Sequence, residues 1–391
     1  MSQKTRDIGP DVLRGFALWG IILVNVAYFS HSVDSGPTAS TLLSTGDAIA
    51  AFLVFVLAQG KFYLIFSFLF GYSAHYVLRN LETGRRRWWW RSAGLVILGV
   101  AHASFLFIGD ILFLYGLLGI VLLAFYGRSE KVIRRWMAWI YGAFAFFSVA
   151  VIALVWSVEA KGFSAAGETS QAAKVYESTV LSGDYLASIP ARFDFWFSEA
   201  ILLVAFQGAL TFVAFLAGVL AARAGALTSN GLAAHTLRGM MGWGLGLGLG
   251  LQLFFGGLWL ANTLSAAPST AVELGSFFGS FLAAPLLSVG YVGLVLTLVR
   301  AKPTVLGWLG RMGRMSLTVY LGQSVILSVI FGGWGLGLYQ EVPYWSAVVI
   351  AVGVTLLLAL GATLWLRWAT QGPMERLLTA WSRVGMSRPS R

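Results

Sequence analysis

The chain has 391 residues, of which 58% are hydrophobic and only 11% are charged. A soluble domain carries about 25% charged residues, so the composition excludes an ordinary soluble protein, and long apolar runs from end to end predict an all-α, polytopic bundle of membrane helices. The absence of cysteine excludes disulfides, thiol catalysis and cysteine metal sites. The net charge of +11 does not indicate nucleic-acid binding, because the basic residues gather at helix ends on one side of the predicted bundle.

About ten membrane spans are predicted, and residues 1–391 are expected to form a single integral membrane domain. The predicted spans are 11–30, 60–79, 91–108, 110–127, 133–157, 193–222, 238–260, 274–299, 316–336 and 345–369. Residues 1–127 supply the N-terminal helices with the polar motif residues, 158–192 form the largest outer loop, and 300–391 supply the C-terminal helices and tail. Residues 47–58 are apolar but interrupted, which predicts a short amphipathic or re-entrant helix.

Both chain ends are predicted to lie in the cytoplasm. With this orientation, all but four of the 27 Lys and Arg residues lie on the inner side, as the positive-inside rule requires. The four others are Lys61, Lys161, Lys174 and Arg192. The Arg and Trp run at 85–91 fits the inner interface, where cations meet anionic headgroups and indoles occupy the aromatic belt. The outer loop 158–192 is polar and is either a cover over an outward-facing site or a solvated connector.

Glycine repeats along the predicted span 238–260. Gly242, Gly246 and Gly250 recur at every fourth position, and Gly244 and Gly248 form a second row. Small residues at this spacing let helices approach closely, so we expect packing faces here, and homodimerisation through this span is left open.

The first span carries a cation and an amide on one face. Arg14 and Asn25 lie eleven positions apart, which in an α-helix is about three full turns, or roughly 16 Å along the axis. Polar groups at membrane depth are costly and mark interior sites, so this face predicts a tunnel through the bundle rather than a passive anchor. His31 follows on the outer side and is a further candidate to reach an outward site.

The second span begins with Lys61, on its predicted outer side. One interpretation is snorkelling, in which the aliphatic stem is buried and the ammonium lies at the interface. The other is a functional role, in which Lys61 binds substrate or stabilises an oxyanion.

The next hairpin carries a histidine and a carboxylate. His102 lies about two turns inside the outer end of its span, and Asp110 lies at the short turn that follows. Histidine has the right intrinsic pKa for a general base and a carboxylate can orient it, so both are predicted to be catalytic. The alternatives are a hydrogen-bonded packing role for His102 and an N-cap role for Asp110. Tyr115 and Asp11 are further candidates for binding substrate or an oxyanion.

No metal site is predicted, because no two histidines have metal-ligand spacing on one helix. No phosphate loop or dinucleotide fingerprint is present. His75 and His235 are expected at the inner interface. Arg314 is a candidate to contact a phosphate-bearing co-substrate on the inner side, although topology alone also explains an arginine there.

Five segments together resemble the YeiB family, integral membrane proteins labelled as a domain of unknown function. The segments are DVLRGFALWGIILVN (11–25), GKFYLIFSFLFG (60–71), LGVAHASFLFIGDILFLYGLLG (98–119), GRMSLTVYLGQS (313–324) and RWATQGPMERLL (367–378). They occur in the right order over nearly the whole chain, and only residues from about 128 to 300 match weakly.

The YeiB family is similar in turn to the transmembrane acyltransferase superfamily, which includes heparan-alpha-glucosaminide N-acetyltransferase and bacterial enzymes that O-acetylate surface polysaccharides. This resemblance implies acyl-CoA as a co-substrate and a place in the bacterial cytoplasmic (inner) membrane. The O-acetylating branch has a histidine at the position of Asn25. At this position the present chain is like the glucosaminide branch instead. This departure argues against Asn25 as the base and leaves it to orient the acceptor or to donate to an oxyanion, with His102 as the base.

The leading hypothesis is therefore acyl transfer across the bilayer. Arg14 and Arg314 would hold the phosphates of the donor, and His102 with Asp110 would deprotonate an acceptor of unknown identity. The alternative is a transporter or flippase of a small amphiphile or anion, in which the same polar residues bind substrate and couple protons. A third hypothesis is a non-catalytic membrane partner. The expected partners are lipid and small molecules, not nucleic acid.

Overall fold

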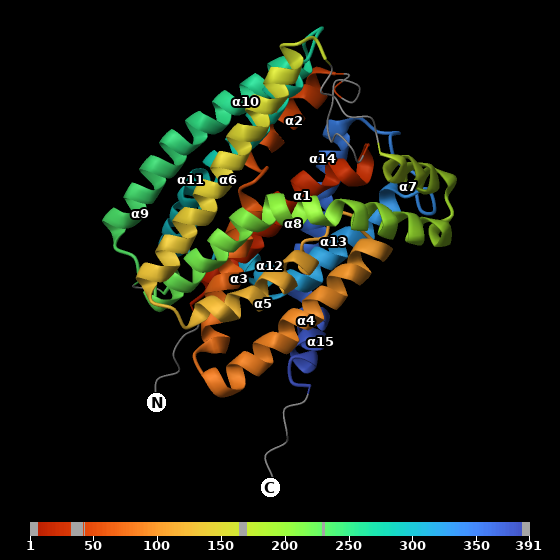
Figure 1. Cartoon of the computed structure of the whole chain (residues 1–391). Helices are drawn as coiled ribbons and strands as arrows, with labels where there is room; N and C mark the ends of the chain where they lie inside the picture. Colours follow the sequence, from red (N-terminus) through yellow and green to blue (C-terminus); the bar gives the residue numbers. More distant parts are fainter. Residues whose placement is uncertain (1–6, 33–41, 43, 164–169, 229–230, 385–391) are drawn as a thin grey trace.

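The computed structural model describes residues 7–32, 42, 44–163, 170–228 and 231–384, and its regular elements in these ranges are all helical (Figure 1). The helices are α1 (Gly9–Ser30), α2 (Thr45–Leu57), α3 (Phe62–Leu78), α4 (Leu81–Phe105), α5 (Leu112–Tyr126), α6 (Glu130–Glu159), α7 (Gln171–Ser182), α8 (Tyr185–Arg223), α9 (Ala234–Met241), the π-helix η1 (Gly242–Gly248), α10 (Leu249–Thr263), α11 (Thr270–Ala301), α12 (Gly307–Arg314), α13 (Ser316–Phe331), α14 (Tyr344–Trp365) and α15 (Pro373–Trp381). The predicted all-α membrane helix bundle is confirmed.

The length and composition of the helices support a polytopic membrane protein. Within the described ranges, seven helical stretches are long and apolar enough to cross a membrane, and an eighth is counted if α12 and α13 form one bent span. All ten predicted spans fall on helices, but α5 has only 15 residues and α4 begins with a charged turn, so neither enters that count. The number ten therefore stays a prediction. The short helix expected at 47–58 is α2.

Two carboxylates cap helix starts at one end of the bundle. Asp47 and Ser44 form a capping box at the start of α2, and Asp47 also accepts a hydrogen bond from the Trp345 N–H, 3.0 Å away, at the start of α14. Glu159, the last residue of α6, accepts from the Thr270 N–H at 2.7 Å and so caps α11. These bonds satisfy N–H groups that a helix leaves unpaired and join neighbouring helices.

Glycine sets the closest helix crossings. A Cβ on Gly15 would meet the backbone of Leu309, and one on Gly313 would meet the carbonyl of Asp11, so α1 and α12 touch backbone to backbone. Gly71 brings α3 against the backbone of α8 in the same way. Any side chain at these positions would push the two helices apart.

The glycine-rich span contains η1 and packs by one glycine row only. Gly244 and Gly248 lie against the backbone of α11. Gly242, Gly246 and Gly250 have no atom within 4 Å of a built Cβ. The expectation of close packing is therefore confirmed for the second row, whereas the first row packs against no described part of this chain, because the two rows point in different directions around the helix.

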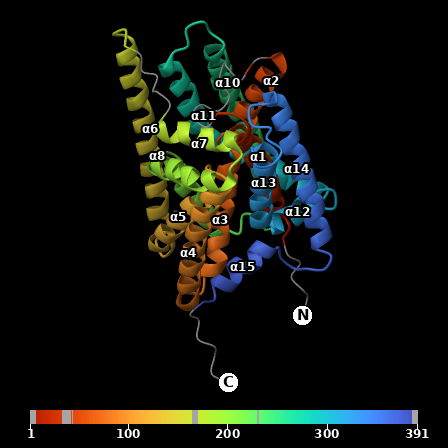
Figure 2. The same cartoon turned by 90° about the vertical axis from the view of Figure 1, so that its right-hand side faces the viewer.

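Helix ends that carry basic residues meet at one end of the bundle, beside α15 (Figure 2). Glu375 of α15 accepts hydrogen bonds from the N–H groups of Leu317 and Thr318, 2.7 and 3.1 Å away, at the start of α13. The rings of Trp90 and Trp381 pack edge to face between α4 and α15. The start of α1 lies at the same end, which agrees with the prediction that both termini lie on one side.

Candidate functional site

The turn between α4 and α5 holds a histidine and an aspartate in contact. His102 lies in the last turn of α4, and Asp110 lies just before α5. Asp110 Oδ1 accepts a hydrogen bond from the N–H of Phe113 at 2.8 Å, so the carboxylate does cap α5. A Cβ on Gly99 would clash with Asp110 and Phe113, and glycine there lets α4 approach the turn this closely.

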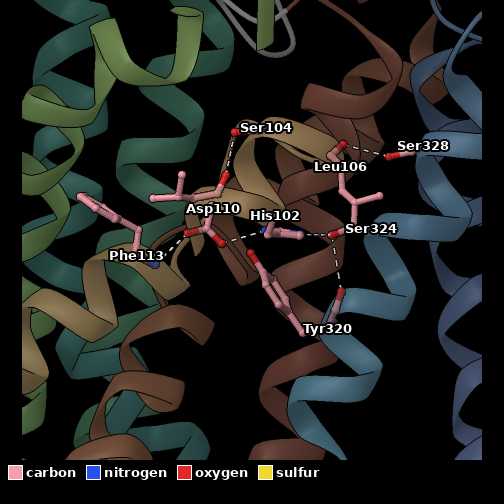
Figure 3. A network of polar contacts seen from close by, with 9 residues as sticks. His102, Ser104, Leu106, Asp110, Phe113, Tyr320, Ser324 and Ser328 are labelled. Carbon is pink, nitrogen blue, oxygen red and sulfur yellow. Dashed lines mark hydrogen bonds and ion pairs between the residues drawn. The ribbon is translucent and has the colours of Figure 1, made fainter. Parts of the chain in front are cut away.

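His102 bridges this carboxylate and a serine hydroxyl (Figure 3). Its Nδ1 lies 2.7 Å from Asp110 Oδ2, and its Nε2 lies 2.9 Å from Ser324 Oγ on α13. We call these three residues the Asp-His-Ser cluster. The exposed fractions are 0% for Asp110, 2% for His102 and 3% for Ser324, so the cluster is enclosed by protein. The contact that the sequence left open is present, and Asp110 caps α5 and binds His102 with different oxygens.

The two contacts of the His102 ring fit one neutral tautomer. With a carboxylate oxygen accepting at Nδ1, the proton lies on that nitrogen and Nε2 is left to offer its lone pair to the serine hydroxyl. This tautomer is the one that a general base requires. The ring of Tyr320 packs on the imidazole with centroids 5.1 Å apart, and the ring of Phe107 lies at 6.2 Å. These rings hold the imidazole plane in place.

Ser324 belongs to the helical serines that bond outside their own helix, as Ser280 does to Gln252 and Ser328 to the carbonyl of Leu106. Others donate to the carbonyl four residues earlier at 2.7–2.8 Å, as in Ser67, Ser73, Ser104, Ser148, Ser276 and Ser288. The Ser324 hydroxyl keeps a long hydrogen bond of 3.4 Å to the carbonyl of Tyr320 and lies closer, at 2.9 Å, to His102 Nε2 (Figure 3). The contact with the imidazole is therefore the shorter of its two contacts.

The α4–α5 turn is covered by the segment predicted as an outer loop. Part of this segment is helical, as α7 and the start of α8, while residues 164–169 lie outside the described residues. The buried Arg192 donates to the carbonyl of Ser104 at 3.0 Å, and the Tyr185 hydroxyl donates to that of Phe105 at 2.9 Å. Of the two interpretations of this segment, the contacts fit a cover.

Arg14 and Arg314, the two predicted donor-binding residues, lie at the same end of the bundle. Arg14 forms an ion pair with Asp11 at 2.9 Å and donates to the hydroxyl of Ser73 on α3. Its side chain is 22% exposed, so part of the guanidinium is accessible. Arg314 ends α12, which crosses α1 beside Asp11, and it donates to the carbonyl of Thr370 at 3.0 Å.

Lys61 and Tyr115 form their contacts away from the Asp-His-Ser cluster. Lys61 Nζ donates to the carbonyl of Phe55 at 2.8 Å, near the end of α2, and lies 3.5 Å from Ser280 Oγ on α11. The side chain is fully buried, so the snorkelling interpretation does not hold. The Tyr115 hydroxyl lies 2.7 Å from Ser67 Oγ on α3. The structure therefore brings neither residue into the Asp-His-Ser cluster.

Asn25 and His31 lie toward the C-terminal end of α1. Asn25 is half-buried, and its side chain makes no hydrogen bond within the described part of the chain. His31 Nδ1 lies 2.7 Å from the Ser30 hydroxyl, and its ring packs edge to face on Tyr344. Burial lowers the pKa of His31, and the carboxylate of Asp47 opposes this effect.

The described residues contain no group of three or more His, Asp or Glu that could hold a metal ion. The side chains of the Asp-His-Ser cluster themselves can supply proton transfer and nucleophilic attack.

Ser324 is not among the site residues predicted from the sequence. Ser324 and His102 are 222 positions apart, so no local spacing connects them. The available signal was weak: Ser324 follows Gln323 within an apolar span and ends the matched segment 313–324. A hydroxyl in a membrane helix is most often bonded to its own backbone, which gives no reason to single it out.

Comparison with known proteins relates the chain to a single family. Residues 221–384, which include Ser324, match the family described as "Protein of unknown function (DUF418)". "Uncharacterized protein YxaH" of Bacillus subtilis (strain 168) is 30% identical over 388 residues, 94% of this chain and 92% of that protein. "Uncharacterized protein YeiB" of Escherichia coli (strain K12) is 27% identical over 389 residues, 95% of each protein. With matches over nearly the full length of both relatives, the chain belongs to the YeiB family of DUF418 membrane proteins.

Proposed function

We propose that this protein is an acyltransferase of the bacterial cytoplasmic membrane, which moves an acyl group from cytoplasmic acyl-CoA to an acceptor at or beyond the outer face. The observation that carries the proposal is the Asp-His-Ser cluster, in which an oriented imidazole holds a hydroxyl at 2.9 Å. Such an arrangement suits acyl transfer, because a hydroxyl becomes nucleophilic as its proton moves to a neighbouring base.

His102 is the proposed general base, and Asp110 is its positioning residue. The base contributes about 10²–10⁴ in rate by accepting a proton as the new bond forms. Asp110 stabilises the imidazolium that results and keeps Nε2 free to accept the proton. The buried setting strengthens this interaction, because little solvent screens the two charges.

The acyl donor is proposed to enter at the end of the bundle where Arg14 and Arg314 lie. A guanidinium binds phosphate oxygens through two parallel hydrogen bonds, and the Arg14 side chain is partly accessible for such contacts. The thioester arm would then extend along α1 toward Asn25. The amide of Asn25 is available to orient the acceptor or to donate to an oxyanion, whereas Lys61 is already bonded to the carbonyl of Phe55.

The direct test measures acyl-CoA binding and consumption by the protein in lipid nanodiscs, with acetyl-CoA and longer acyl-CoAs. His102→Ala should reduce consumption by at least about 100-fold. The exposed His235 of α9 provides the matched control, and His235→Ala should behave as wild type. Arg14→Ala should weaken saturable binding of the donor. If the wild-type protein neither binds nor consumes any acyl-CoA, the proposal is wrong.

The second candidate function is transport of a small amphiphile or anion. It is favoured by the break between α12 and α13, which are bent by 84°, since transporters bind substrates at broken helices. In this protein, however, Glu375 already accepts from two N–H groups at the start of α13, where a substrate anion would bind. Accumulation of an unchanged substrate in sealed vesicles would support transport over acyl transfer.

A further inference from the structure

Ser324 is placed to act as a nucleophile. We propose that its hydroxyl accepts the acyl group and carries it as an ester before transfer to the acceptor. This proposal rests on the acyl-transfer function proposed above. It adds a covalent intermediate, so that acyl transfer proceeds in two half-reactions rather than by direct attack of the acceptor on the donor.

The geometry of the Asp-His-Ser cluster matches the roles of a nucleophile, a base and an orienting acid. Ser324 Oγ is 2.9 Å from His102 Nε2, and the other ring nitrogen is 2.7 Å from Asp110. The backbone N–H of Phe113 holds the second carboxylate oxygen. Such a constellation is recognised by distances and roles rather than by residue order or fold.

The lengths of the two hydrogen bonds of Ser324 are the second observation. Seven other helical serines in the described part of the chain donate to the carbonyl one turn earlier at 2.7–2.8 Å. Ser324 keeps only a 3.4 Å hydrogen bond to the carbonyl of Tyr320 and lies 2.9 Å from His102 Nε2. Ser328, one turn later on α13, also bonds outside its helix, but to a backbone carbonyl, so Ser324 is the one of the two whose hydroxyl faces a base.

The position of Ser324 along the helix explains the use of an ester. Ser324 is the ninth residue of α13, which begins at Ser316 beside α15, and it lies about 12 Å along the helix axis from that start. A group held there is in the interior of the bundle, between the end that carries Arg14 and the outer end covered by Arg192. An acyl ester lets the donor thiol leave from one side before the acceptor arrives from the other.

The chemical steps balance without any further reactant. In the first half-reaction, Ser324 Oγ attacks the thioester carbonyl carbon, and its proton passes to His102 Nε2. The tetrahedral intermediate collapses, the carbon–sulfur bond breaks, and the departing thiolate takes the proton from the imidazolium. In the second, the acceptor hydroxyl or amine gives its proton to His102 and attacks the ester carbon. The Ser324–acyl bond breaks, and the proton returns to Oγ.

The experiment traps the ester. Full-length protein in nanodiscs is mixed with acetyl-CoA in the absence of acceptor, and free CoA thiol and acetylated peptides are measured within one turnover. A second sample is treated with a fluorophosphonate, which labels activated serines without any recognition of CoA. We expect one equivalent or less of thiol per protein and both modifications on Ser324. Ser324→Ala should abolish both, whereas Ser148→Ala, a buried serine of α6 bonded only to its own helix, should not.

The outcomes separate this proposal from the proposed function. If acetyl-CoA is consumed while no ester forms and Ser324→Ala behaves as wild type, acyl transfer stands and the nucleophile is not Ser324. If the fluorophosphonate labels Ser324 but no acyl-CoA is consumed, the nucleophile stands and the proposed donor is wrong. If neither reagent modifies Ser324 and no acyl-CoA is consumed, both proposals are overturned.

Discussion

Replacing Asp110 with asparagine tests the base directly, because the local contacts determine how the amide must orient. The substituted side chain would have one acceptor oxygen, and the N–H of Phe113 requires an acceptor at the present position of Oδ1, 2.8 Å away. The amide NH₂ then takes the place of Oδ2, 2.7 Å from His102 Nδ1, and donates to it. The ring must move its proton to Nε2, where it can no longer accept from Ser324.

The expected loss follows from this change of tautomer. Without a base, turnover should fall by about 10³-fold, which corresponds to about 4 kcal/mol of transition-state stabilisation. The folded state should lose only about 1 kcal/mol, because both hydrogen bonds of residue 110 are kept with roles exchanged. The melting temperature should therefore change little while activity collapses.

Nitrogen-15 NMR of the imidazoles reads the tautomer without any knowledge of the substrate. The chain has four histidines, and the His102 signals are assigned by their loss in His102→Ala. The wild-type ring should be protonated at Nδ1 and the Asp110→Asn ring at Nε2. An Asp110→Asn variant that keeps the wild-type tautomer, or that retains activity within tenfold of wild type, would refute the reasoning.

Two further predictions concern stability. Gly313→Leu places a side chain where α12 touches the carbonyl of Asp11 and should destabilise the protein by at least about 1–3 kcal/mol, whereas Gly246→Leu, with open space around its Cβ, should leave the melting temperature unchanged. Equal melting temperatures would contradict the observed crossing. Because the pKa of His31 is lowered in the folded protein, the unfolded chain binds the proton more tightly, so the stabilisation is present above about pH 6.5 and is lost as the pH falls below it. Thermal melts from about pH 7 to pH 5 should show this loss, and His31→Gln should reduce it; an unchanged slope in the variant would exclude His31 as the cause.

The features predicted correctly from the sequence depend on residues close together in the chain. Apolar runs long enough to span a bilayer became helices, since in lipid each backbone polar group must be bonded within its own segment. His102 and Asp110 are eight positions apart across one tight turn, so the sequence placed both on one hairpin but left open whether they touch. The position of this half of the site could be predicted without the fold, whereas the contact itself could not.

The features that were missed depend on packing between distant helices. Two glycine rows with the same spacing lie on one span, and only the position of α11 decides that Gly244 packs while Gly246 does not. Lys61 was placed correctly at the start of its helix, but α2 and α11 enclose it. Ser324 resembles any other helical serine until α13 is set against the α4–α5 turn.

The cap that Glu375 forms on α13 has a consequence for the biogenesis of the protein. Translation produces the hairpin with His102 and Asp110 early, the helix with Ser324 much later, and α15 after that. A nascent polypeptide therefore inserts His102 and Asp110 into the bilayer before Ser324 has been synthesised. The Asp-His-Ser cluster is complete only when α13 docks and Glu375 caps its start, so a partly synthesised copy lacks the cluster.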